Sequence, residues 1–271
     1  MPLSKRNALT KWMLLLSLLA MITLAVGFGF ALAPKSLASS DTPGLSSSDL
    51  EDDALLAPPS AILPKTGTLK LVSMGDSLTR GVGDSTGKGY IEVFKQTVAT
   101  NRNQPIQLSN LAVSGYESVD LLRQLEQPNV KRLLSEANLI MFTIGGNDLF
   151  RQSGGVFGLE LQKVESATDK LATHYDQILT KIREVNPHAP IIYTELYNPF
   201  GDTEIQKDSG EAVLAWNNQA ALIAQKYSNI ITIPTYDLFW KKENKYLYTD
   251  HFHPNKAGYQ QIAERLVQAL P

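Results

Sequence analysis

Short apolar runs alternate with amphipathic helical patterns from about residue 67 onward, and this alternation constrains the fold more than any other feature. The runs predict strands at 69–74, 106–113, 139–144, 191–196 and 230–233. The helical patterns fall at 90–100, 118–125, 159–184, 209–227 and 255–270. Strands connected by helices pair in parallel through right-handed crossovers. The sequence therefore predicts a three-layer α/β/α sandwich with a mostly parallel five-stranded sheet, of the flavodoxin-like kind.

The first 34 residues have a different character. Residues 12–34 carry no charged side chain, and a helix of about 20 apolar residues is long enough to cross a bilayer. Lys5, Arg6 and Lys11 precede this run, which orients the short N-terminal tail toward the cytoplasm. Residues 31–33 and 36–38 both resemble cleavage sites. We therefore expect 1–34 to be a signal peptide or a membrane anchor, and either one exports the rest of the chain.

Residues 35–66 are rich in Ser, Pro, Asp, Ala and Leu, and no helical or strand period persists through them. Prolines at positions 43, 58, 59 and 64 interrupt the segment further. This composition is typical of a flexible linker. The strand and helix patterns then place a single globular domain at 67–271.

Composition removes several classes of function. The chain has no cysteine, which excludes disulfides, thiolate metal sites and a cysteine nucleophile. A formal net charge of −2 gives no reason to expect nucleic acid as a partner. No phosphate loop or dinucleotide glycine fingerprint is present, so no organic cofactor is expected. His174 and His188 have no partner at metal-ligand spacing, and no metal site is expected either.

Chemistry-bearing residues follow several of the predicted strands. Gly75-Asp76-Ser77 comes after the first, Gly115 after the second, and Gly145-Gly146-Asn147-Asp148 after the third. Asp250 and His253 stand just before the last helix. Sites in parallel sheets form beyond the carboxyl ends of the strands, so we expect these segments to converge at one edge.

These segments resemble the four blocks of the SGNH/GDSL hydrolase family, and the resemblance extends from Leu69 to Leu270. Ser77, in Gly75-Asp76-Ser77-Leu78, falls at the nucleophile position of the first block. Gly115 falls at the glycine of the second block, Asn147 at the asparagine of the third, and Asp250-x-x-His253-Pro254 matches the last. The resemblance implies a GDSL-type lipase or acylhydrolase.

Ester hydrolysis by a serine sets physical requirements that these residue types meet. The Ser77 hydroxyl needs a base to take its proton, and His253 can do so and later protonate the leaving alcohol. Asp250, three residues earlier, can bind the other ring nitrogen and stabilise the imidazolium. The resemblance further suggests an oxyanion hole made of the backbone N–H groups of Ser77 and Gly115 and the side-chain amide of Asn147.

Simpler interpretations of the same residues remain open. Ser77 can be a helix N-cap alone, Gly115 and Asn147 can be ordinary turn residues, and Asp250 and His253 can belong to a surface loop. His251 competes with His253 for the role of base.

Other candidates carry weaker signals. Ser85, in Gly83-Asp84-Ser85-Thr86-Gly87, fits a nucleophile-elbow pattern, but the stretch before it is short and broken by glycine. Glu195 and Asp202 follow the fourth predicted strand and are candidates to line the site.

The sequence thus favours an exported serine esterase or lipase-like acylhydrolase that works through an acyl-enzyme. Its expected substrates are small-molecule or lipid esters, with lysophospholipids and acylated cell-wall glycans among them. An uncleaved N-terminal segment would add the membrane as a partner. The alternatives are a carbohydrate O-acetylesterase, an acyltransferase of the same fold and a non-catalytic wall-binding module.

Overall fold

The computed structural model describes residues 63–151, 153 and 159–270. The segment expected to be a signal peptide or anchor, at 1–34, lies outside these residues, as does nearly all of the linker predicted at 35–66. Within the described ranges, no helix is both long enough and apolar enough to cross a membrane.

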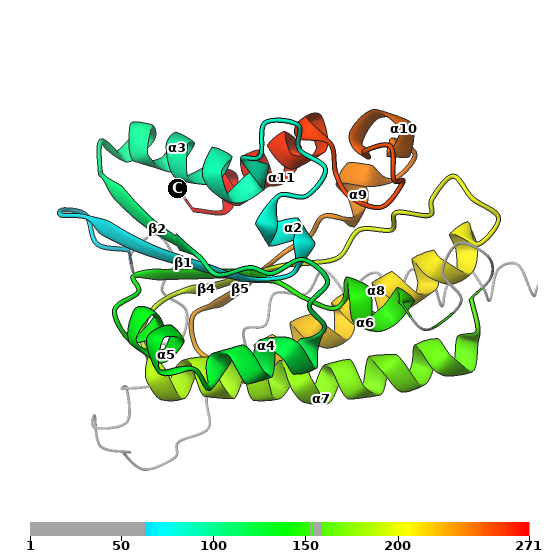
Figure 1. Cartoon of the computed structure of the whole chain (residues 1–271), viewed down its shortest axis with the longest axis horizontal. Helices are drawn as coiled ribbons and strands as arrows, with labels where there is room; N and C mark the ends of the chain where they lie inside the picture. The colour runs from blue at the N-terminus through cyan, green and yellow to red at the C-terminus, as the bar shows by residue number, and fades with distance from the viewer. Residues whose placement is uncertain (1–62, 152, 154–158, 271) are drawn as a thin grey trace, which may run out of the picture. The chain divides into compact units, whose positions relative to one another are not determined.

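A five-stranded sheet with the order β2-β1-β3-β4-β5 forms the middle layer (Figure 1). Its strands are β1 (Leu69–Gly75), β2 (Ile106–Asn110), β3 (Leu139–Thr143), β4 (Ile191–Thr194) and β5 (Ile230–Ile233). Every neighbouring pair is parallel, and in the central pair Gly75 of β1 lies opposite Thr143 of β3. The predicted fold class is confirmed.

Helices cover both faces of this sheet (Figure 1). One face carries α3 (Gly89–Arg102) and α11 (Lys256–Ala269), and the other carries α4 (Ser118–Leu125), α5 (Pro128–Ser135), α7 (Leu161–Val185) and α8 (Gln206–Ala224). Alternate residues of the strands enter the two cores: Leu71 and Met141 pack on the α3/α11 side, whereas Val72 and Phe142 pack on the opposite side. Burial on both faces explains why the central strands β3 and β4 are nearly continuous apolar runs.

The second strand is shorter than predicted and ends at Asn110 instead of residue 113. The Asn110 side chain accepts a hydrogen bond from the backbone N–H of Ala112 at 3.1 Å, which turns the chain out of the extended conformation. The chain still runs beside β1, because the N–H groups of Leu111 and Val113 donate to the carbonyls of Ser73 and Gly75.

Several short helices had no counterpart among the predicted elements. Besides α5, these are α2 (Ser77–Arg80), α6 (Gly146–Phe150), α9 (Tyr236–Phe239) and α10 (Glu243–Tyr246). The four that have only four or five residues are too short to show a helical period in a sequence. Two of them, α2 and α6, begin directly after β1 and β3 and position the candidate site.

The strand order reverses at the carboxyl ends of β1 and β3. From β1 the chain crosses to β2 on one side, and it later returns past β1 to form β3 on the other. Such a reversal of strand order is where ligands bind in open α/β sheets. Ser77 and Asn147 follow these two strands, so both lie at the reversal.

Gly75 permits the close pairing of β1 and β3 at this point. Its φ angle is +109°, and an added Cβ atom would lie 1.9 Å from the carbonyl oxygen of Thr143. We expect Gly75→Ala to lower the free energy of unfolding, measured by urea denaturation, by at least about 3 kcal/mol, because the clash adds to a backbone strain of about 1–3 kcal/mol.

Gly87→Ala is the matched control for this variant. Gly87 also has a positive φ angle, +68°, but no heavy atom lies within 4 Å of an added Cβ. Its expected loss is therefore the backbone strain alone, about 1 kcal/mol. Equal losses for the two variants would contradict the role of the Thr143 contact.

Candidate active site

Ser77 lies on a tight turn between β1 and α2. Asp76 caps the N-terminus of α2, and its Oδ1 atom accepts hydrogen bonds from the Leu78 N–H at 3.0 Å and the Thr143 hydroxyl at 2.6 Å. Ser77 is the first helical residue and is buried. The capped turn fixes where the Ser77 hydroxyl points.

Asp76 is a buried carboxyl group directly below this turn. Burial raises its pKa, and the hydrogen bonds from Thr143 and Leu78 oppose that rise only in part. The Thr143 hydroxyl also lies 2.8 Å from the Thr79 hydroxyl, which in turn lies 2.7 Å from the Tyr90 hydroxyl. The turn that carries Ser77 therefore rests on a buried hydrogen-bonded network instead of an apolar contact.

A second tight loop carries Asp250 and His253. Asp250 Oδ1 accepts hydrogen bonds from the backbone N–H groups of Phe252 and His253, each at 3.0 Å. Asp250 Oδ2 lies 2.7 Å from His253 Nδ1. The His253 carbonyl accepts from the Tyr248 N–H at 2.7 Å, which ties the loop to the chain that precedes it.

The two loops meet although they are 176 residues apart in the sequence. His253 Nε2 lies 2.7 Å from Ser77 Oγ. Partial burial raises the pKa of Asp250, but the hydrogen bonds from His253 and Phe252 outweigh it and lower the pKa overall. An ionised carboxylate, an imidazole and a hydroxyl thus form one continuous chain of hydrogen bonds.

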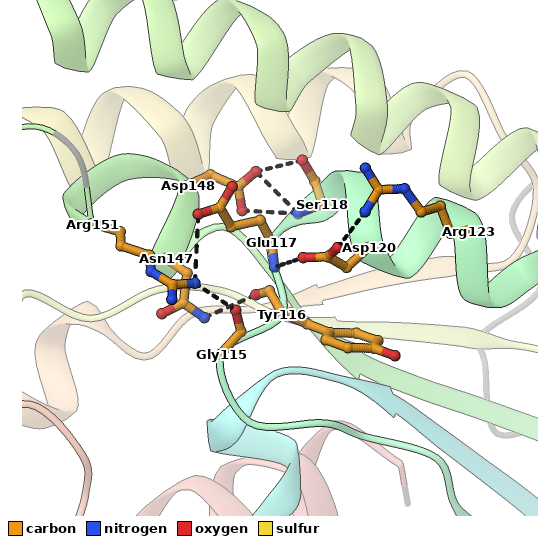
Figure 2. Close-up of polar contacts among 9 residues, drawn as sticks. All are labelled: Gly115, Tyr116, Glu117, Ser118, Asp120, Arg123, Asn147, Asp148 and Arg151. Carbon is orange, nitrogen blue, oxygen red and sulfur yellow. Dashed lines mark hydrogen bonds and ion pairs between the residues drawn. The ribbon is translucent and has the colours of Figure 1, made fainter.

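Gly115 lies in the loop after β2 and Asn147 lies in α6 after β3, and the two segments are neighbours (Figure 2). The Asn147 side-chain amide donates to the Tyr116 carbonyl at 2.8 Å, which orients it and leaves its second hydrogen available. Within the described ranges, the backbone N–H groups of Ser77 and Gly115 donate to no protein acceptor. Two unpaired backbone donors and one oriented amide are therefore available in the segments that follow β1, β2 and β3.

An open cleft of about 420 Å³ adjoins these residues. Gly115, Asn147 and Asp250 line its polar side. Its apolar side is formed by Phe150, Phe200 and Phe252, with ring centroids 5.1 Å apart for Phe150–Phe200 and 6.2 Å for Phe200–Phe252.

The sequence carries little signal that these three phenylalanines line the cleft. Phe252 stands between Asp250 and His253 and Phe150 follows Asn147 by three residues, but such spacing is an aid only once the fold is known. Phe200 has no such signal.

The competing candidates lie elsewhere. Ser85 is exposed in the loop between α2 and α3 and does not follow a strand. His251 lines the cleft with its Nδ1 atom 3.9 Å from Asp202 Oδ2 and makes no hydrogen bond to Ser77. Glu195 is half-buried, and its carboxyl does not line the cleft. Asp202 therefore contacts a residue that lines the cleft but does not line it directly, and Glu195 does neither.

The loop that contains Ser85 packs against the loop that carries His253. A Cβ atom on Gly83 would lie 2.5 Å from the Pro254 carbonyl oxygen and 3.0 Å from His253 Cβ.

Within the part of the chain that the structure describes, no group of three or more His, Asp or Glu side chains is arranged to hold a metal ion.

Comparison with known proteins assigns the family. The model of the GDSL-like lipase/acylhydrolase family matches residues 73–261. The chain belongs to this family. It is an ester-hydrolysing serine hydrolase of the esterase and lipase type.

Two relatives and two solved structures illustrate its neighbours. The uncharacterized protein YpmR of Bacillus subtilis is 36% identical over 74% of this chain and 80% of its own. The spore germination lipase LipC of Bacillus licheniformis is 30% identical over 73% and 95%. A lipase from a goat rumen metagenome has a TM-score of 0.65 at 28% identity over 74% and 97%. An acetylxylan esterase from Geobacillus stearothermophilus shares the fold, with a TM-score of 0.59 at 20% identity over 76% and 96%.

The buried Asp76 gives a prediction for stability against pH. Because its pKa is raised in the folded state, the folded protein holds this proton more tightly than the unfolded chain does, and stability falls as pH rises from about 4 through the folded pKa. Asp76→Asn has no such proton. We expect its free energy of unfolding, relative to the parent, to increase with pH across that window in urea titrations.

Asp84→Asn provides a control with the opposite sign. Burial raises the pKa of Asp84, but hydrogen bonds from Thr86, Lys88 and Gly89 lower it overall. The stability that this carboxylate contributes is present above about pH 4 and is lost as pH falls through the folded pKa. Asp84→Asn should therefore lose stability relative to the parent as pH rises. Parallel curves for Asp76→Asn and the parent would contradict the burial effect.

Proposed function

We propose that this chain is an exported esterase of the lipase-like acylhydrolase type, which cleaves carboxylic esters through a Ser77–His253–Asp250 triad. The observation that carries the proposal is the chain of hydrogen bonds from Asp250 Oδ2 through His253 to Ser77 Oγ, with both distances at 2.7 Å. The same three residues in any other hydrogen-bond order would not activate the hydroxyl.

The reaction follows from this arrangement. Ser77 Oγ attacks the ester carbonyl carbon while its proton passes to His253 Nε2. The tetrahedral intermediate collapses as His253 gives that proton to the leaving alcohol, and Ser77 is left acylated. A water molecule then loses a proton to His253 and attacks the acyl group, and the acid is released as Ser77 regains its proton. Asp250 stays ionised throughout and stabilises the imidazolium, in keeping with its lowered pKa.

The oxyanion of both tetrahedral intermediates requires donors that are in place beforehand. We assign this role to the N–H groups of Ser77 and Gly115 and to the Asn147 side chain. These residues follow β1, β2 and β3, respectively. The unpaired state of both backbone donors supports the assignment, since no protein bond must break before they bind the oxyanion.

The acyl portion of the ester fits the apolar side of the cleft. Phe150, Phe200 and Phe252 present aromatic rings beside the oxyanion donors Gly115 and Asn147. Each buried CH₂ group adds about 0.8 kcal/mol of binding, so this surface favours acyl chains longer than acetyl. The likeness to a relative named as a lipase supports the same substrate class.

Loss of the Ser77 hydroxyl tests the triad. We expect Ser77→Ala to lower kcat about 10⁴-fold or more, as removal of a triad serine does elsewhere, and to abolish labelling by a fluorophosphonate. The control is Ser85→Ala, which removes the exposed alternative serine and should label like the parent. Full activity in Ser77→Ala together with its loss in Ser85→Ala would overturn the assignment.

The same assay, run with p-nitrophenyl esters from acetyl to palmitoyl, tests the acyl preference. We expect kcat/KM to rise beyond acetyl as the chain gains contact with the phenylalanines. Hydrolysis restricted to the acetyl ester would contradict that preference and favour an O-acetylesterase, while leaving the triad intact.

Export is proposed from residues 12–34, which are apolar and follow Lys5, Arg6 and Lys11. In intact bacterial cells the globular domain should be digested by added protease or recovered from the medium. Replacement of the three basic residues by Glu should reduce this exposure. Full protection of the domain in intact cells, with digestion only after lysis, would contradict export.

A further inference from the structure

The proposed oxyanion donors come from two separate segments of the chain. Gly115 lies in the loop after β2, whereas Asn147 lies in α6, a helix of five residues after β3. So short a helix has no independent stability in water. Leu149 and Phe150 anchor α6 in the core, and polar contacts with the loop at 111–117 set the position of Asn147 relative to Gly115.

Exposed contacts make one part of this connection. Arg151, at the end of α6, donates to the Gly115 carbonyl at 3.2 Å and lies 3.8 Å from the Glu117 carboxylate (Figure 2). The Arg151 side chain is 61% exposed, so solvent weakens both contacts. The Asn147 amide adds a direct bond to the Tyr116 carbonyl at 2.8 Å, and a buried contact between the same two segments lies beside it.

Asp148 and Ser118 supply the buried connection. The Ser118 backbone N–H donates to both carboxylate oxygens of Asp148, at 3.0 and 3.1 Å, and the Ser118 hydroxyl also contacts Oδ1 (Figure 2). Ser118 is fully buried. Asp148 follows Asn147 directly, so this carboxylate fastens the first turn of α6 to the first turn of α4.

His174 of α7 completes the network. Its Nδ1 atom lies 2.8 Å from Ser118 Oγ. A serine hydroxyl has a single hydrogen, and with Asp148 ionised that hydrogen is donated to the carboxylate. His174 must then present Nδ1–H as the donor to Ser118 Oγ, and the order of donation is His174 to Ser118 to Asp148.

This network is not a second triad. Ser118 stands between the imidazole and the carboxylate, so the imidazole cannot take its proton while the carboxylate orients the ring. Its hydroxyl is also fully buried. Asp148 and His174 also line a pocket of about 620 Å³, which shares no lining residue with the cleft beside Asn147.

We propose that Ser118 and His174 are positioning residues for the oxyanion hole, acting through Asp148 on Asn147. Burial raises the pKa of Asp148, and the bonds from Ser118 oppose that rise. The pKa is raised overall, so these bonds offset the cost of burial only in part, but the hydroxyl and the backbone N–H of Ser118 together keep the carboxyl group fastened to α4. The proposal rests on the function assigned to Asn147 above.

A matched pair of His174 variants tests the direction of donation. Asn can place its side-chain N–H near the position of Nδ1, whereas the longer Gln places its N–H near Nε2. In the full chain, with a soluble p-nitrophenyl ester, we expect His174→Gln to lower kcat about tenfold with KM within about twofold, as for partial loss of one oxyanion donor. His174→Asn should recover most of that loss. Equal kcat values for Gln, Asn and the parent would overturn the proposal.

Ser118→Ala tests whether the effect passes through Asn147. Alone it should lower kcat by about 10- to 100-fold, less than or equal to the loss in Asn147→Ala. In the Asn147→Ala background it should have almost no further effect, because residues that act as a unit are not additive. A full additional loss in the double variant would show a general structural role and contradict the proposal.

Failure of this proposal is distinct from failure of the proposed function. If Ser77→Ala retains activity, the triad is wrong. If Ser77→Ala is inactive and the His174 pair behaves like the parent, the triad stands and the positioning network does not. Where Ser118→Ala fails to fold, as seen by circular dichroism, the His174 pair still decides, since His174 is only partly buried.

Discussion

The pairing of β1 with β3 is the contact on which the rest of the molecule depends. It places the strand order reversal at the centre of the sheet, and it brings Gly75 so close to the Thr143 carbonyl that only a residue without Cβ fits. Ser77 and Asn147 leave the two strands at this point, so the spacing between the proposed nucleophile and a proposed oxyanion donor is set by ordinary strand geometry. The fold supplies that distance before any side chain is considered.

Much of the fold and the outline of the site could be predicted from the sequence, because strong local signals carry them. Strands buried on both faces are continuous apolar runs, and a helix such as 118–125 shows its period clearly. The block residues Ser77, Asn147, Asp250 and His253 stand at strand ends or before a helix, where topology brings them together. Their meeting across 176 residues follows from parallel connections and not from any local pattern.

The features that could not be predicted depend on packing between distant segments. Ser118 and His174 contact each other across 56 residues, and no spacing in the sequence marks the pair. Phe200 joins the cleft only because the chain after β4 passes beside Phe150 and Phe252. The predicted end of β2 was also wrong, because the strand ends where the Ala112 N–H donates to the Asn110 side chain. Pairwise contacts of this kind leave no trace in hydropathy or residue spacing.

The molecule contains two groups of serine, histidine and aspartate, and their hydrogen-bond order separates their chemistry. In one, the imidazole lies between Asp250 and Ser77, so it can accept a proton from the hydroxyl while the carboxylate stabilises the charge that forms. In the other, the hydroxyl lies between His174 and Asp148, so its proton is already committed to a carboxylate. Residue types alone would rate the two groups as equal. Because only the first leaves a serine oxygen free to attack, the role that we propose for the second is to hold the Asn147 amide donor in place.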